Sequence, residues 1–151
     1  MRHEHRVPNP YPYAFVILAL ATLGCTTSST FNFEADPRIN NGLLLTIDLV
    51  QVSDAEEQLI RDLGDEWFYS DLRRRLGSRT RTVAIQGGDR KNAVIVPDKS
   101  CKECTRLAII ADYQFEGRDQ KAQMEFRSKD AWRGKTLRVK VFDRYLTISG
   151  G

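Results

Sequence analysis

The segment Leu43-Leu-Leu-Thr-Ile-Asp-Leu-Val-Gln-Val52 decides the fold. Successive side chains of a β-strand point to opposite sides, so alternate positions share one face. One face of this segment is purely aliphatic and carries Leu43, Leu45, Ile47 and Leu49. The opposite face mixes Leu44, Val50 and Val52 with Thr46 and Asp48, which indicates that it is also partly covered. We therefore expect a strand over residues 43–52 with cover on both sides.

A helical segment is predicted to follow this strand. Ser53-Asp-Ala-Glu56 matches a capping box, in which Ser53 caps the helix and Glu56 returns a hydrogen bond to the cap. Apolar residues then recur at helical spacing, at Leu59, Ile60, Leu63 and Trp67, and again at Phe68, Leu72 and Leu76. Gly64 can bend or end the helix, and Gly77 is a natural stop. Residues 53–77 are therefore expected to form a helix or two short helices inserted between strands.

Apolar and polar residues alternate, as in β-strands, both before the helical segment and after it. The further predicted strands cover residues 30–35, 80–86, 93–97, 107–115, 122–126, 137–141 and 146–148. Turn residues separate them, including Asn40-Asn41-Gly42, Gly87-Gly88-Asp89 and Glu116-Gly-Arg-Asp119. About seven short strands with regularly spaced turns are typical of a β-sandwich. The expected fold is mainly β, with residues 31–151 as one β-sandwich domain and residues 53–77 as its helical insertion.

The N-terminus has the composition of a secretory signal. Arg2 and Arg6 give a positive start, residues 14–24 are apolar or small, and a polar stretch follows Cys25. This run is shorter than the roughly 20 apolar residues that span a bilayer. The end of the run resembles a bacterial lipoprotein box, which implies cleavage before Cys25 and acylation of that cysteine; a buried cysteine in a plain signal peptide is the alternative. We expect a lipoprotein signal peptide over 1–24 and a lipidated cysteine with a polar tether over 25–30.

The mature chain lacks the residues of several common active sites. His3 and His5 both precede Cys25, so no histidine remains after cleavage. This excludes a Ser-His-Asp or Cys-His arrangement and a Cys/His zinc site. Losing two arginines and one glutamate lowers the formal net charge from +3 to about +2, which argues against a nucleic-acid binder. We expect no catalytic residues, cofactor, metal or small-molecule substrate.

Charged residues within the predicted elements have structural interpretations. Arg73-Arg74-Arg75 is expected to be a solvated helix face, with an anionic lipid or a partner as the alternative contact. Asp48 and Asp112 lie in the middle of strands, and no paired-acid spacing marks them as catalytic.

Cys101-Lys-Glu-Cys104 is the one motif that could carry chemistry. A local disulfide is the favoured interpretation, because the motif lies in a loop that runs directly into a strand. A redox dithiol would place the first cysteine at a helix N-terminus, where a thiolate is stabilised. Half of a metal site is the third interpretation, although the second half is missing. All three remain open at this stage.

The ordered series of segments resembles the TssJ family, the outer-membrane lipoproteins of type VI secretion systems. Cys25 and the polar tether come first, and the segment Phe31-Asn-Phe-Glu-Ala-Asp-Pro-Arg-Ile-Asn40 is similar to the family's first strand and loop. The apolar strand 43–52, a helical insertion ending near Trp67-Phe68, and Leu107-Ala-Ile-Ile-Ala-Asp-Tyr113 follow in the family's order. The resemblance covers nearly all of residues 25–149.

The resemblance implies a transthyretin-like β-sandwich with an added helix and no enzymatic activity. It also implies a lipid anchor in the outer membrane, on the periplasmic face, and binding to the periplasmic C-terminal domain of TssM. The contact in the family uses the loop between the first two strands, which here is Asp36, Pro37, Arg38, Ile39, Asn40, Asn41 and Gly42. Within it, Arg38 offers a charged fork, Ile39 an apolar anchor, and Pro37 limits the entropy lost on docking. An ordinary hairpin connection is the alternative.

Two other functions remain possible from the sequence. One is a small periplasmic lipoprotein of another kind, such as a secretion pilotin or a ligand-binding module. The other is a dithiol oxidoreductase that uses Cys101 and Cys104.

Overall fold

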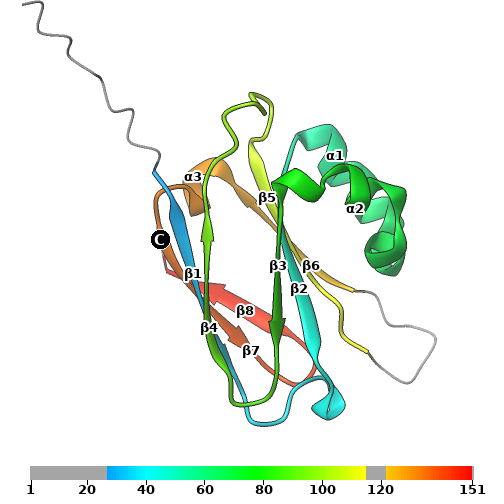
Figure 1. Ribbon diagram of the computed structural model, residues 1–151, viewed down its shortest axis with the longest axis vertical. Helices are drawn as coiled ribbons and strands as arrows, with labels where there is room; N and C mark the ends of the chain where they lie inside the picture. The colour runs from blue at the N-terminus through cyan, green and yellow to red at the C-terminus, as the bar shows by residue number, and fades with distance from the viewer. Residues whose placement is uncertain (1–26, 115–121, 151) are drawn as a thin grey trace, which may run out of the picture.

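The protein is a sandwich of two four-stranded sheets, seen in a computed structural model that describes residues 27–114 and 122–150 (Figure 1). The first sheet has the order β4-β1-β7-β8, with β4 at Arg90–Ile95, β1 at Ser29–Ala35, β7 at Thr136–Val141 and β8 at Leu146–Ser149. The second sheet has the order β3-β2-β5-β6, with β3 at Thr80–Ile85, β2 at Leu45–Val52, β5 at Arg106–Ala111 and β6 at Gln123–Ser128.

Strand β1 lies inside the first sheet between two neighbours. It pairs antiparallel with β4 and parallel with β7, so Phe31 lies opposite Ala93 on one side and Leu137 on the other. The remaining strand pairs are antiparallel. Inward side chains from both sheets form the main core, which includes fully buried Phe31, Ile47, Leu49, Ile109 and Leu137. This is the two-layer arrangement that the alternating sequence requires, because each sheet buries one apolar face against the other.

A second apolar cluster lies on the outer face of the second sheet, under the helical insertion. The insertion consists of α1 (Asp54–Leu63), the 3-10 helix η2 (Gly64–Tyr69), α2 (Asp71–Arg75) and the short turn η3 (Gly77–Arg79). Ile60 and Trp67 are completely buried there against Val50, Val52 and Ile110. Strands β2 and β5 are therefore covered on both faces, which explains why the segment 43–52 is apolar on both sides.

The sandwich and its helical insertion confirm the predicted fold class. The capping box is present, because the Ser53 side chain accepts a hydrogen bond from the Glu56 backbone and the Glu56 side chain accepts one from the Ser53 backbone. Gly64 ends α1 with a positive φ of 55°, so the insertion is several short helices. A further helical turn, α3 (Lys129–Trp132), was not expected from the sequence; it places Trp132 in the core.

Several predicted strand boundaries were wrong. Strand β5 ends at Ala111, four residues before the predicted end, so Asp112 lies just beyond the strand and not in its middle. Strand β2 begins at Leu45, because the preceding Leu43 and Leu44 belong to a loop and are about half exposed. Strand β4 begins at Arg90, three residues before the predicted start, because the turn at Gly87-Gly88-Asp89 is tight. The predicted signal peptide, Cys25, Phe115 and the turn 116–119 lie outside the described residues. Within the described residues, no helix has both the length and the apolar character needed to cross a membrane.

Candidate functional site

The loop between β1 and β2 has an unusual backbone. Asn40, Asn41 and Gly42 all have positive φ, at 48°, 54° and 79°, and form the short 3-10 turn η1 (Asn40–Gly42). Asparagine and glycine tolerate this left-handed region better than other residues. The predicted turn chemistry of these three residues is therefore confirmed.

Side-chain hydrogen bonds fix this loop. The Asn40 amide nitrogen donates to the Leu44 carbonyl at 3.0 Å, and its amide oxygen accepts from the Gln114 backbone at 2.6 Å. The Asn40 backbone N–H donates to the carbonyl of Asp143, in the turn between β7 and β8. Asn40 is fully buried, so these bonds satisfy a polar side chain that would otherwise be costly to bury.

The turn between β3 and β4 supports the other half of the loop. A Cβ atom on Gly87 would lie 2.1 Å from the Pro37 carbonyl oxygen, so only glycine allows this approach. The Gly88 backbone N–H donates to the Asp36 carbonyl at 3.0 Å. The loop is thus held by turns from both sheets and is ordered before any partner arrives.

The structure separates the seven loop residues into two groups. Ile39 and Asn40 are completely buried, whereas Asp36, Pro37, Arg38, Asn41 and Gly42 are exposed. The expectation that Ile39 offers an exposed apolar anchor was wrong, because its side chain is buried in the main core and attaches the loop to it.

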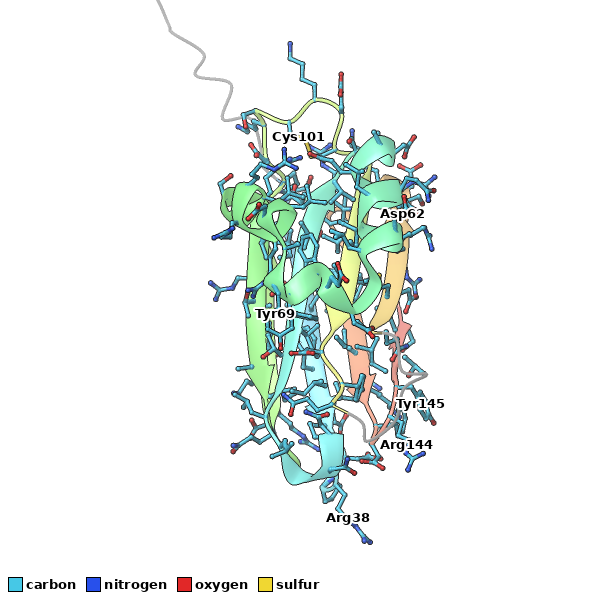
Figure 2. All side chains as sticks on the ribbon, turned by 90° about the vertical axis from the view of Figure 1, so that its right-hand side faces the viewer. Arg38, Asp62, Tyr69, Cys101, Arg144 and Tyr145 are labelled. Carbon is cyan, nitrogen blue, oxygen red and sulfur yellow. A yellow bond between two sulfur atoms is a disulfide. The ribbon has the colours of Figure 1, made fainter. Side chains whose placement is uncertain are left out.

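Other residues supply the apolar surface that Ile39 does not. Leu43, Leu44 and Tyr145 are each about half exposed, and an open depression of about 500 Å³ is lined by Arg38, Asn41, Gly42 and Asp143. We call the exposed residues 36–38, 41–44 and 143–145 the distal surface. Figure 2 shows Arg38 and Arg144 at the end of the molecule opposite Cys101.

The CxxC motif forms a disulfide between Cys101 and Cys104, as predicted. Residues 101–105 are turn and coil, so Cys101 does not begin a helix, unlike the first cysteine of a helical redox motif. Among the described residues, no group of three potential His, Cys, Asp or Glu ligands is placed to hold a metal ion.

An unforeseen contact joins this disulfide to the helical insertion. One Arg79 nitrogen, Nη1, lies 2.8 Å from Cys104 Sγ and 3.1 Å from Cys101 Sγ. The same guanidinium donates to both oxygens of Glu56, at 3.0 and 2.5 Å. Burial disfavours the charged form of Glu56, but hydrogen bonds from Arg79 and Ser53 outweigh it and lower the pKa of that carboxyl.

A second unforeseen network fixes the insertion to the sheet. Asp48 is completely buried on β2 and accepts hydrogen bonds from Trp67 Nε1 at 3.0 Å, Arg73 Nε at 2.7 Å and Thr82 Oγ1 at 2.6 Å. Arg73 is therefore not part of a solvated helix face, whereas Arg74 and Arg75 are exposed as expected. The hydrogen bond to Asp48 raises the pKa of Arg73. Burial raises the pKa of the neighbouring Asp112.

Comparison with known proteins gives matches in structure only. No protein-family model matches the chain, and no curated protein matches its sequence. A chain of a structure described as "Type VI membrane complex" superposes with a TM-score of 0.65 and 12% identity over 81% of this chain and 97% of the other. A chain of a structure described as "T6SS protein TssM C-terminal domain (869-1107) from EAEC" gives 0.63 and 11% over 82% and 98%.

The third match is the type VI secretion lipoprotein TssJ1 from Pseudomonas aeruginosa. It superposes with a TM-score of 0.55 and 14% identity over 83% of this chain and 97% of TssJ1. In all three cases nearly the whole matched chain is covered, so the likeness includes both sheets. The chain described here therefore has a TssJ-like fold, the β-sandwich of the type VI secretion lipoproteins.

Proposed function

We propose that this protein is a lipid-anchored, non-enzymatic component of a type VI secretion membrane complex. It is held by Cys25 in the periplasmic face of the outer membrane and binds the periplasmic C-terminal domain of a TssM-like inner-membrane protein. The observation that carries the proposal is the fold shared with TssJ1 over almost its whole length. The lipoprotein-like N-terminus of the sequence agrees with it.

The arrangement of the domain suits a link between two bodies. Strand β1 begins at Ser29, close behind Cys25 in the sequence, and ends at Ala35, next to the loop 36–42 (Figure 1). A chain anchored at Cys25 would therefore present the distal surface away from the membrane.

The distal surface has properties that favour protein binding. Its backbone is ordered by Asn40 and by the close contact of Gly87 with Pro37, so little loop entropy is lost on docking. Leu43, Leu44 and Tyr145 provide apolar contact area. Arg38 presents a guanidinium, which pairs well with a carboxylate of a partner.

Partner binding can be tested with the charge-reversing variant Arg38→Glu. We expect it to weaken binding to the TssM-like periplasmic domain at least tenfold, because charged anchors at the centre of an interface carry much of its energy. Arg75→Glu is the matched control, since Arg75 is exposed on the helical insertion. Titration calorimetry with both purified proteins gives the affinities. Equal binding by wild type and Arg38→Glu would remove this loop from the interface.

Anchoring has a separate test. Cys25→Ser should move the protein from the membrane fraction to the soluble periplasmic fraction, because acyl chains supply the membrane affinity. Intact mass spectrometry of the membrane-extracted protein should show Cys25 as the first residue with added acyl mass. An unmodified N-terminus would contradict the anchor and leave the partner-binding test standing on its own.

A further inference from the structure

The disulfide occupies an electropositive position at the end of the sandwich opposite the distal surface (Figure 2). A cavity of about 150 Å³ next to both cysteines is lined by four cations, at Lys99, Lys102, Lys129 and Arg133, and by one carboxylate, at Asp98. Both cysteines are partly exposed. Partly exposed, electropositive surroundings are typical of reactive cysteines, whereas structural cysteines are usually buried and inert.

Arg79 provides a specific partner for one sulfur atom. Its side chain is only 15% exposed, and the bidentate contact with Glu56 fixes its orientation. Its Nη1 is closer to Cys104 Sγ, at 2.8 Å, than to Cys101 Sγ, at 3.1 Å. A disulfide sulfur is a weak, uncharged acceptor, whereas a thiolate is charged. The guanidinium is therefore held where negative charge develops only on reduction.

The two sulfur atoms differ in access. Cys101 borders the cavity of about 150 Å³ and a second one of about 300 Å³, whereas Cys104 borders only the first. An incoming thiolate thus has more room at Cys101. Cys104 is the sulfur with the closer cation, so the two roles of target and leaving group fall on different cysteines.

We propose that the Cys101–Cys104 disulfide is a reversible thiol–disulfide exchange site that reacts with a dithiol, and that Arg79 holds the departing Cys104 thiolate. A thiolate of the dithiol attacks Cys101 Sγ and forms a mixed disulfide, while the Cys101–Cys104 bond breaks and its electron pair leaves on Cys104 Sγ. The second thiol of the reagent then loses its proton to water and attacks the reagent's own sulfur in the mixed disulfide. Cys101 leaves as a thiolate, and both cysteines can take up protons. The dithiol is oxidised to a disulfide by two electrons, and the protein disulfide is reduced by two.

Several charges act on the new thiolate. Arg79, Arg133 and the three lysines favour it, while the carboxylates Asp98, Glu103 and Glu56, which line the adjoining cavity, oppose it. Glu56 is the carboxylate that shares Arg79 with Cys104. Neutralising Arg79 and neutralising Glu56 should therefore shift the thiol pKa in opposite directions.

The test measures thiol reactivity in the full-length chain in detergent. The protein is reduced with dithiothreitol, the reagent is removed under nitrogen, and iodoacetamide alkylation is followed against pH by peptide mass spectrometry, which separates Cys104 from Cys101 and Cys25. We expect Cys104 to titrate about 1 to 3 units below the ordinary thiol value near 8.5. Arg79→Gln should raise the Cys104 pKa toward that value, and Glu56→Gln should lower it further.

Arg81→Gln is the matched control, because Arg81 is exposed on β3 and has no contact with the cysteines among those observed. Its Cys104 pKa should equal that of the wild type. Circular dichroism verifies folding; if Arg79→Gln does not fold, Arg79→Lys and Glu56→Gln decide the result. An ordinary Cys104 pKa in the wild type, or a lowered one that is unaffected by Arg79 and Glu56 substitutions, would overturn the proposal.

Discussion

The buried carboxylate of Asp48 should be the strongest single polar contact between the helical insertion and the sheet. Oδ2 accepts from Trp67 and from Arg73 Nε, while Oδ1 accepts from Thr82 and, at 3.3 Å, from Arg73 Nη2. Asp48→Ala removes the acceptor for all of these donors. Breaking a buried ion pair costs about 3 to 5 kcal/mol, and because Arg73 remains 32% exposed and can recover water, we expect about 3 kcal/mol.

Asp48→Asn should cost less, for a geometric reason. If the amide nitrogen replaces Oδ1, the hydroxyl of Thr82 can rotate and accept, and the bonds from Trp67 and Arg73 Nε survive. The variant then loses the charge and the longest bond, worth about 1.5 to 2 kcal/mol by comparison with hydrogen bonds to charged groups. Asp71→Asn is the matched control, because Asp71 pairs with Arg74 while both side chains are nearly four-fifths exposed, so the substitution should change stability by less than about 1 kcal/mol.

The assay is urea unfolding of the full-length chain in a non-ionic detergent, followed by tryptophan fluorescence and circular dichroism. The expected order of destabilisation is Asp48→Ala, then Asp48→Asn, then Asp71→Asn. If Asp48→Ala behaves like Asp71→Asn, the network adds nothing to the apolar contacts of Trp67, and the reasoning is refuted.

Three further outcomes are expected. The pKa of Glu56 is lowered in the folded state, so its ionised form contributes to stability fully above its ordinary pKa of about 4.5. This contribution is lost as the pH falls through the lowered pKa. The stability of Glu56→Gln, followed by acid unfolding, should therefore not show this decrease. Asp112 has the opposite effect on the pH dependence of stability, because its pKa is raised and its ionisation destabilises the fold as the pH rises. Asp112→Asn should therefore raise the urea unfolding midpoint at pH 7. A lowered midpoint would contradict this. Gly87→Ala should displace Pro37 and weaken partner binding in calorimetry at least tenfold, while Gly77→Ala, with open space around it, should bind normally.

The sequence predicted those features that depend on neighbouring residues. The capping box needs only Ser53 and Glu56, three positions apart, and it formed as expected. The two-sided apolar character of residues 43–52 correctly indicated cover on both faces. The disulfide was also a local prediction, favoured over a redox dithiol and half of a metal site because the motif lies in a loop that runs directly into a strand.

Features that depend on distant residues could not be predicted in the same way. Asp48 takes its partners from positions 19, 25 and 34 residues away, and no periodicity relates these positions. Arg79 reaches the cysteines across 22 and 25 residues for the same reason. Ile39 is a single apolar residue in a polar loop, and this pattern fits an exposed binding residue and a buried core residue equally well. Its burial depends on how the two sheets close around it.

The position of β1 has a mechanical consequence. Both neighbours pair with it along most of its length, from Ser29–Ile95 to Glu34–Arg90 and from Thr30–Thr136 to Ala35–Val141. In the proposed assembly, traction from the membrane enters at the start of β1, and a partner bound at residues 143–145 pulls on the end of β7. These two strands are parallel, so the opposed forces shear the β1–β7 ladder, and its hydrogen bonds share the load instead of breaking one at a time. Stretching the molecule between Ser28 and Arg144 should consequently need more force than stretching it between Ser28 and Gly150, where β8 at the sheet margin can peel away first.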